Sequence, residues 1–185
     1  MISARICTGF IFVCVMLGLG LGIRISSLVP DHQRPTEIEW LTTPRPVALL
    51  PGMMDNHNWK LIALGYSRCP DVCPTTLGAM ASLKRISDSP VDYFFLSLDA
   101  VSESSVVHYA AAFDPRIRGV TATSKQVRHF VDSAGAQYEL SEVINGPVAH
   151  STFLILVDPT GLMRGRVRQG FQVNELSREF AKLAF

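Results

Sequence analysis

Short apolar runs alternate with amphipathic stretches over most of the chain. Strand-length apolar runs, bounded by turn-forming residues, occur at 61–66, 91–98, 152–157 and 163–168. Apolar residues recur at helical spacing over 73–86, 103–113, 124–134 and 174–183. A further strand is expected near residues 40–50. Strands that alternate with helices and end in a hairpin and a last helix predict an α/β fold, with a mixed sheet flanked by helices.

The longest apolar segment lies near the N-terminus and accounts for the positive mean hydropathy of +0.23. Residues 6–23 carry no charged side chain. As a helix, this segment measures roughly 27 Å, close to the hydrocarbon thickness of a bilayer. Residues 1–25 are therefore predicted to be a transmembrane anchor. The alternative is a cleaved signal peptide, but residues 19–24 lack its small-residue cleavage pattern.

Residues 26–46 are polar and rich in proline, which is typical of a flexible tether, and residues 47–185 form the predicted soluble domain. Without Arg5 and Arg24, 15 basic side chains remain against 16 acidic ones. No block of Lys or Arg lies along the chain. The charge that supplies most nucleic-acid affinity is therefore absent, and we expect no nucleic-acid partner.

The soluble part contains two cysteines, Cys69 and Cys73, at the junction between a strand and a helix that has Pro74 in its first turn. A helix N-terminus lowers the pKa of a nearby thiol, which improves it as a ligand and as a nucleophile. Paired thiolates select Cu(I), zinc or iron–sulfur centres. Zinc and iron–sulfur sites usually need four protein ligands, so the pair favours copper. Two buried apolar cysteines, or a stabilising disulfide, remain the alternative.

Five histidines are candidates for a third ligand. His150 precedes the predicted strand 152–157, and residues near strand ends in an α/β sheet meet over a common crevice. A surface or hydrogen-bonded histidine is the alternative at this position. The other four lie in the tether, after a turn and on helix surfaces: His32, His57, His108 and His129. Met53 and Met54 beside His57 are interpreted as core filler rather than as a copper-handling patch.

The run Gly65-Tyr66-Ser67-Arg68-Cys69-Pro70-Asp71-Val72-Cys73-Pro74-Thr75-Thr76-Leu77 resembles the signature of the Sco/SenC copper chaperones. The resemblance extends from about residue 49 to the C-terminus and includes residues 97–99, 118–121, 150–152 and 156–161. It implies a thioredoxin-like fold that binds one copper ion, as Cu(I) or Cu(II), through Cys69, Cys73 and His150. It also implies a role in assembling the binuclear copper site of cytochrome c oxidase subunit II.

The resemblance further implies a single-pass protein of an inner membrane. No Arg-rich, Ser-rich leader precedes the anchor, so we expect a bacterial protein whose domain faces the periplasm rather than a mitochondrial one. The expected partners are subunit II or another cuproprotein, and a copper donor or a thiol reductant. Two positions depart from the family pattern, which has Asp at the position of Ala149 and Val-Asp-Pro at residues 98–100.

Three functions fit these residues. The leading one is a copper metallochaperone that uses Cys69, Cys73 and His150. The second is a thiol–disulfide reductase, in which Cys69 or Cys73 attacks a client disulfide and the other cysteine resolves the mixed disulfide. This function does not need His150. The third is a peroxidase of the same fold, assisted by Arg68 and Thr75.

Overall fold

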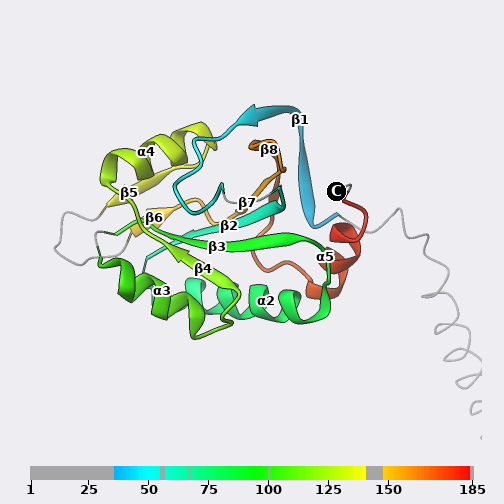
Figure 1. Ribbon diagram of the computed structural model, residues 1–185, viewed down its shortest axis with the longest axis horizontal. Helices are drawn as coiled ribbons and strands as arrows, with labels where there is room; N and C mark the ends of the chain where they lie inside the picture. Colours follow the sequence, from blue (N-terminus) through cyan, green and yellow to red (C-terminus); the bar gives the residue numbers. More distant parts are fainter. Residues whose placement is uncertain (1–35, 55–56, 67, 100, 141–147, 184–185) are drawn as a thin grey trace, which may run out of the picture. The chain divides into compact units, whose positions relative to one another are not determined.

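The computed structural model describes residues 36–54, 57–66, 68–99, 101–140 and 148–183 (Figure 1). The predicted anchor and residues 26–35 of the predicted tether lie outside this part of the chain. Within the described ranges, no helix combines the length and the hydropathy needed to cross a membrane. At one boundary the structure differs from the prediction, because residues 38–46 form a strand rather than tether.

The described part of the chain contains the following helices and strands: β1 Ile38–Pro46, β2 Trp59–Gly65, α2 Val72–Ile86, β3 Val91–Ser97, α3 Glu103–Ala111, β4 Ile117–Val120, α4 Ser124–Ser133, β5 Tyr138–Leu140, β6 Val148–His150, β7 Leu154–Val157, β8 Leu162–Val167 and α5 Val173–Phe180. The main sheet has the strand order β1-β8-β7-β2-β3-β4, and β5 pairs with β6 in a separate ribbon. β3 pairs in parallel with β2 and with β4. The other neighbouring pairs, β1–β8, β8–β7 and β7–β2, are antiparallel. The predicted mixed sheet is confirmed.

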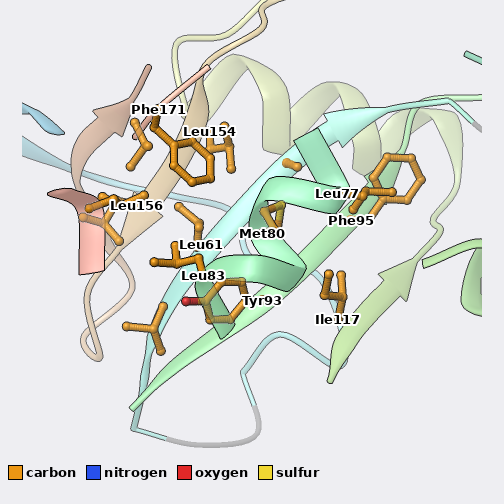
Figure 2. Packing of buried hydrophobic residues seen from close by; sticks show 14 of the residues in the cluster. Leu61, Leu77, Met80, Leu83, Tyr93, Phe95, Ile117, Leu154, Leu156 and Phe171 are labelled. Carbon is orange, nitrogen blue, oxygen red and sulfur yellow. The ribbon is translucent and has the colours of Figure 1, made fainter. Parts of the chain in front are cut away.

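Two hydrophobic cores cover the two faces of the sheet. The α2 core contains buried residues of the sheet and of α2, α3 and α5, including Leu61, Ala63, Leu77, Met80, Tyr93, Phe95, Ala110, Leu156, Leu176 and Phe180 (Figure 2). The α4 core includes Ile62, Leu64, Phe94, Leu96, Val127, Phe130, Val131, Ile155 and Val157. Alternate strand residues point to opposite faces, so the continuous apolar runs of β2 and β3 serve both cores. Both central strands are thereby fixed between layers of helices.

The site described below lies where the parallel strands β2 and β3 end. Gly65 is paired with Ser97 at the end of the ladder, and the Leu98 N–H donates to the Gly65 carbonyl oxygen at 2.8 Å. The loops that follow the two strands therefore leave the sheet at the same edge. The loop after β2 leads into α2, which packs across the sheet in the α2 core. This arrangement brings the N-terminus of α2 to the edge of the sheet.

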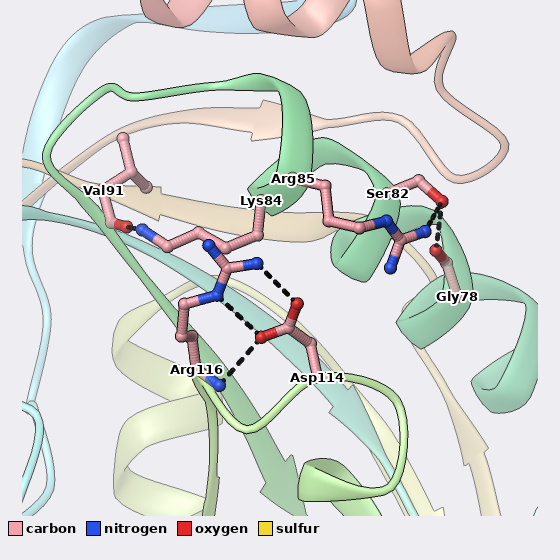
Figure 3. A network of polar contacts seen from close by, with 7 residues as sticks. All are labelled: Gly78, Ser82, Lys84, Arg85, Val91, Asp114 and Arg116. Carbon is pink, nitrogen blue, oxygen red and sulfur yellow. Dashed lines mark hydrogen bonds and ion pairs between the residues drawn. The ribbon is translucent and has the colours of Figure 1, made fainter.

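A buried carboxylate fixes the turn that enters β4. Asp114 is 7% exposed and binds Arg116 through three contacts: from backbone N at 2.9 Å, from Nε at 2.9 Å and from Nη2 at 2.7 Å (Figure 3). These contacts, led by the guanidinium hydrogen bonds, lower the pKa of Asp114 to about 2. The carboxylate therefore stabilises the fold at every pH at which it remains ionised.

We expect Asp114→Asn to lower the free energy of unfolding by about 1 kcal/mol at neutral pH, because the half-exposed arginine is partly screened by solvent. The folded-state pKa lies below the unfolded value of about 3.9, so the stabilisation is present above that pH. It is lost as pH falls from about 4 toward 2, and the variant and wild type should converge there. Urea unfolding measured across this range tests the expectation. Asp88→Asn, at an exposed position, serves as the control, and a pH-independent difference would contradict the assignment.

Candidate metal centre

Cys69 and Cys73 lie together at the N-terminus of α2. The Cys69 N–H donates to the Tyr66 carbonyl oxygen at 3.1 Å and closes a turn directly after β2. Cys73 lies in the first turn of the helix, and its N–H donates to Cys69 Sγ at 3.3 Å. The structure records both residues as free thiols, with Cys73 buried and Cys69 partly exposed. The two cysteines are thus neighbours at the start of α2, at the predicted junction between a strand and a helix.

The two thiols have opposite electrostatic environments. Burial acts to raise the pKa of Cys69, but hydrogen bonds from the Cys73 thiol and from the N–H groups of Cys73, Asp71 and Val72 outweigh burial and lower this pKa. Burial, reinforced by the hydrogen bond to Cys69, raises the pKa of Cys73 to about 12. Cys69 is therefore the more acidic sulfur and Cys73 holds the proton that it shares with Cys69. The helix N-terminus acts on Cys69 more than on the cysteine inside the helix.

Gly65 makes room for the buried sulfur. A Cβ atom added to this residue would lie 2.8 Å from Cys73 Sγ and 2.5 Å from Cε2 of Phe95. The strand end, the Phe95 ring and Cys73 therefore pack with no space for a side chain at residue 65. A glycine at the end of a strand signals close approach of another group, and this signal was present in the sequence but was not used.

His150 ends β6, and a hydrogen bond to the backbone orients its ring. Its Nδ1 lies 2.8 Å from the Ser151 carbonyl oxygen, which can only accept, so Nδ1 donates and Nε2 keeps its lone pair. Ser151 is itself fixed, because its N–H donates to the Gln137 carbonyl at 2.9 Å and its hydroxyl accepts from the Gln137 N–H at 3.0 Å. The backbone thus orients the imidazole in the way that a carboxylate often does in metal sites.

His150 and Cys73, the buried member of the cysteine pair, border the same small space. His150 and Cys73 both line a cavity of about 10 Å³, together with Thr76, Leu77 and Phe95. The His150 ring also meets the ring of Tyr66 edge to face, with centroids 6.4 Å apart. The Tyr66 hydroxyl is hydrogen-bonded to Cys69 on its other side, and burial, followed by this sulfur, raises the Tyr66 pKa. Tyr66, which the sequence analysis did not select, therefore links the histidine to the thiols.

The three predicted ligands do not form a closed set. Among the described residues, no three His, Cys, Asp or Glu side chains lie close enough to hold one metal ion. The cysteine pair is assembled, and His150 stands across the cavity with its Nε2 lone pair available. Two sulfurs and one imidazole nitrogen are a donor set that suits copper. The residues present thus fit a copper ion in chemistry.

The other candidate residues have structural explanations. Met53 is fully buried in the α4 core, which confirms its interpretation as core filler, whereas the same interpretation of Met54 is wrong because this side chain is exposed, as is His57. The Thr75 hydroxyl donates to the Asp71 carbonyl oxygen at 3.0 Å rather than to a sulfur, so it offers a peroxide no activating donor. Ala149 is exposed, and His150 Nδ1 is satisfied by the Ser151 carbonyl without a carboxylate at that position.

Comparisons with known proteins agree on one family. The model of the SCO1/SenC family matches residues 55–184. Protein SCO2 homolog, mitochondrial, of Homo sapiens is 29% identical over 136 residues, which are 65% of this chain and 50% of that protein. A putative copper-binding protein of Stutzerimonas stutzeri is 25% identical over 128 residues, or 65% of this chain and 63% of that protein. The chain spans about half the length of the SCO2 homologues of fish, human and mouse that it matches.

Solved structures share the fold. Apo Sco1 of Thermus thermophilus has a TM-score of 0.68 at 23% identity and covers 82% of this chain and 99% of its own. ScoI of Bradyrhizobium japonicum with copper bound has a TM-score of 0.64 at 19% identity, covering 76% and 97%. Yeast Sco1 with copper bound has a TM-score of 0.63 at 21% identity, covering 78% and 88%. The predicted thioredoxin-like α/β fold is confirmed.

Proposed function

Because this chain belongs to the SCO1/SenC family, we propose that it is a copper metallochaperone that binds one copper ion through Cys69, Cys73 and His150. The observation that carries the proposal is the paired sulfurs at the N-terminus of α2, with His150 lining the same cavity as Cys73. Copper is bound in the solved structures of the Bradyrhizobium and yeast relatives, which supports copper as the cargo. The client is proposed to be the binuclear copper site of cytochrome c oxidase subunit II, or another cuproprotein.

The residues suggest how cargo is taken up and released. Cys69, whose pKa is lowered, is the thiol that ionises more readily, whereas Cys73 must release its proton to solvent when a metal ion binds. Thiolates favour Cu(I), and the imidazole nitrogen of His150 adds a ligand that also suits Cu(II). Three ligands leave room for a partner's cysteines to approach. Transfer then proceeds by exchange of ligands without exposure of free copper.

The setting of the domain is part of the proposal. Residues 1–25 would anchor the chain once in a bacterial inner membrane, with the domain in the periplasm, where a copper donor or a thiol reductant would meet it. The apolar segment at residues 6–23 motivates the anchor, and the resemblance to the family motivates the orientation. An alkaline phosphatase fused to the C-terminus should be active in whole cells. A fluorescent C-terminal GFP fusion would place the domain in the cytoplasm and overturn the orientation.

A thiol–disulfide reductase is the second candidate, and the asymmetry of the two thiols favours it. The Cys69 thiolate would attack a client disulfide, and one client sulfur would leave as a thiolate. Cys73, after losing its proton, would then attack Cys69 Sγ and release the second client thiol. The two electrons come from the cysteine pair, which ends as a disulfide and needs a thiol reductant to be reset. His150 takes no part in these steps.

His150→Ala separates the two functions. The full-length protein, reduced and anaerobic, is titrated with Cu(I) and with Cu(II), and the reduction of a subunit II disulfide is followed in parallel. We expect one copper per wild-type chain, and about tenfold or greater loss of Cu(II) affinity in His150→Ala, because the nitrogen ligand of the site is removed. The rate of disulfide reduction should not change.

His108→Ala is the matched control, because His108 Nδ1 also contacts a backbone carbonyl, at 2.6 Å, but from an exposed position on α3. It should bind copper as the wild type does. If wild-type protein binds no more copper than a variant without both cysteines, yet reduces the disulfide, the reductase replaces the chaperone. If His150→Ala matches the wild type with both copper ions, His150 is not a ligand.

A further inference from the structure

The β5–β6 ribbon ends in a pair of residues whose side chain takes the place of a backbone acceptor. Gln137 precedes β5 and Ser151 follows β6, directly after the Tyr138–His150 pair (Figure 1). The Ser151 N–H donates to the Gln137 carbonyl oxygen at 2.9 Å. In a regular antiparallel pair, the second bond would run from the Gln137 N–H to the Ser151 carbonyl oxygen. Here the Gln137 N–H donates to Ser151 Oγ instead, at 3.0 Å.

The Ser151 carbonyl, which the ladder does not use, is the group that holds the His150 ring. Its oxygen lies 2.8 Å from His150 Nδ1 and can only accept, so Nδ1 carries the proton. Ladder bonds lie in the plane of a ribbon, whereas side chains stand roughly perpendicular to it. One direction of the carbonyl therefore does not serve both the Gln137 N–H and the imidazole. Ser151 resolves this conflict because it offers two acceptors, Oγ and the carbonyl oxygen.

The Gln137 N–H is a donor whose position is fixed by the end of α4. Gly135 adopts a left-handed conformation with φ of 62°, and the N–H groups of Gly135 and Ala136 each donate at 3.0 Å to carbonyl oxygens in the last turn of the helix. These are the paired bonds of a Schellman motif. Gln137 follows immediately, so its N–H is held against the end of β6. If the Ser151 hydroxyl were removed, the regular ladder bond to the Ser151 carbonyl is the replacement that the ribbon provides.

We propose that Ser151 is a positioning residue whose hydroxyl reserves the Ser151 carbonyl for His150 and so keeps the imidazole in its Nδ1–H form. In this tautomer, Nε2 has the lone pair that a metal ion needs. Metal-binding histidines usually donate their other ring N–H to a carboxylate, a backbone carbonyl or water. Ala149 supplies no carboxylate here, and the Ser151 carbonyl takes that place. The role of the tautomer in copper binding rests on the proposed function, whereas the tautomer itself does not.

Ser151→Ala tests the tautomer in the metal-free, full-length protein. Long-range ¹H–¹⁵N NMR correlations of the His150 ring are recorded at a pH about two units above the reference pKa of histidine, where the imidazole is neutral. We expect the Nδ1–H form in the wild type and a shift toward the Nε2–H form, which a free imidazole prefers, in Ser151→Ala. Neither Gln137 nor Ser151 belongs to the α2 core or the α4 core, so the variant should fold. Ser151→Thr keeps the hydroxyl and should restore the wild-type pattern.

The same variants are then titrated with Cu(II). Affinity should fall about three- to tenfold in Ser151→Ala, which is less than the loss expected for His150→Ala, because the ligand remains but must change tautomer before it binds. The copper hyperfine splitting in the EPR spectrum should also change, because the ring is no longer held in one orientation. Ser151→Thr should recover both the affinity and the spectrum.

Ser133→Ala is the matched control. Ser133 Oγ also accepts from a backbone N–H that is distant in sequence, that of Ala48 at 3.0 Å, and its hydroxyl donates to the Phe130 carbonyl oxygen. Neither bond involves the β5–β6 ribbon. This variant should keep the wild-type tautomer, affinity and EPR spectrum. A tautomer shift as large as that in Ser151→Ala would show a general effect of losing such a bond, and would overturn the proposal.

The outcomes separate this inference from the proposed function. If metal-free Ser151→Ala keeps the Nδ1–H form, or if Ser151→Thr does not, the hydroxyl has no positioning role and the chaperone proposal stands. If the tautomer shifts in Ser151→Ala while Cu(II) affinity and the EPR spectrum stay as in the wild type, Ser151 positions the ring but His150 is not a copper ligand. The ligand set of the proposed function is then wrong.

Discussion

Cys73→Ser is expected to abolish tight binding of Cu(I) and to leave the fold in place. Cys73 is 3% exposed, and its sulfur is packed at the end of β2 against Gly65. A serine oxygen is smaller and is a hard ligand, which a soft Cu(I) ion does not favour. Two sulfurs are the main ligands that the site offers, so the loss of one should lower affinity by several orders of magnitude. Competition with a chromophoric Cu(I) chelator measures this effect.

Cys69→Ser is the matched variant. Comparison of the two variants shows what each thiol contributes to copper binding and to stability. Both variants should lose copper. Only Cys73→Ser should lower the free energy of unfolding, by about 1 kcal/mol, because a buried sulfur is replaced by a smaller polar group. Cys69 is partly exposed, and its replacement should change stability little. A Cys69→Ser protein that retains wild-type copper affinity would show that the sulfurs do not act as a pair.

The same two variants respond differently if the protein reduces disulfides. Cys69 has the lowered pKa and is the expected attacking sulfur. Cys73→Ser should then accumulate a mixed disulfide with its client, because the resolving thiol is missing. Cys69→Ser should form none. Trapping of the client by Cys69→Ser instead would reverse the assigned roles.

The elements with strong local patterns were predicted well. β2, which is buried at every residue, was predicted at residues 61–66 and is found at Trp59–Gly65. α4 was predicted at residues 124–134 and is found at Ser124–Ser133, with a capping box between Thr123 and Gln126 at its start. Apolar periodicity and capping are local properties, so the sequence alone determines such elements.

The strands that were missed or only partly predicted owe their pairing to the rest of the fold. β4 has only four residues, which include Arg118 and Gly119, and it forms because β3 offers it a parallel edge. β1 was predicted in part, as a strand near residues 40–50, but it is largely exposed at the edge of the sheet, and its prolines also suggested a tether up to residue 46. The short ribbon of β5 and β6 carries no strong alternation. In each of these segments the local sequence is as compatible with a turn or a loop as with a strand.

The metal centre was predictable where it is local and unpredictable where it depends on the fold. Cys69 and Cys73 are neighbours in sequence, and the helix start at Pro74 indicated their setting. His150 became a candidate through its position near a strand end, and its ligand role stays a prediction. Tyr66 lies in the motif itself, but its edge-to-face contact with His150 joins elements that are distant in sequence, so the sequence carried no signal for that contact. The thioredoxin-like fold followed from family resemblance rather than from periodicity.

Gly65→Ala is expected to be the most damaging single methyl addition near the site. The new Cβ would lie 2.5 Å from Cε2 of Phe95 and 2.8 Å from Cys73 Sγ, both well inside normal contact. Phe95 is 1% exposed and Cys73 is held in the first turn of α2, so neither can move into free space. Overpacking of this kind costs about 1–3 kcal/mol of stability. It should also displace the sulfur and weaken copper binding.

Gly78→Ala provides a control, because it is expected to change stability in the opposite direction. Gly78 lies inside α2, and a Cβ atom added there would have no neighbour within 4 Å. Alanine favours a helix over glycine by up to about 1 kcal/mol, so this variant should be more stable than the wild type and bind copper normally. Thermal unfolding and chelator competition on both variants give the comparison. If Gly65→Ala were as stable as Gly78→Ala and bound copper equally well, then the close packing of β2, Phe95 and Cys73 would not be what holds the buried sulfur in place.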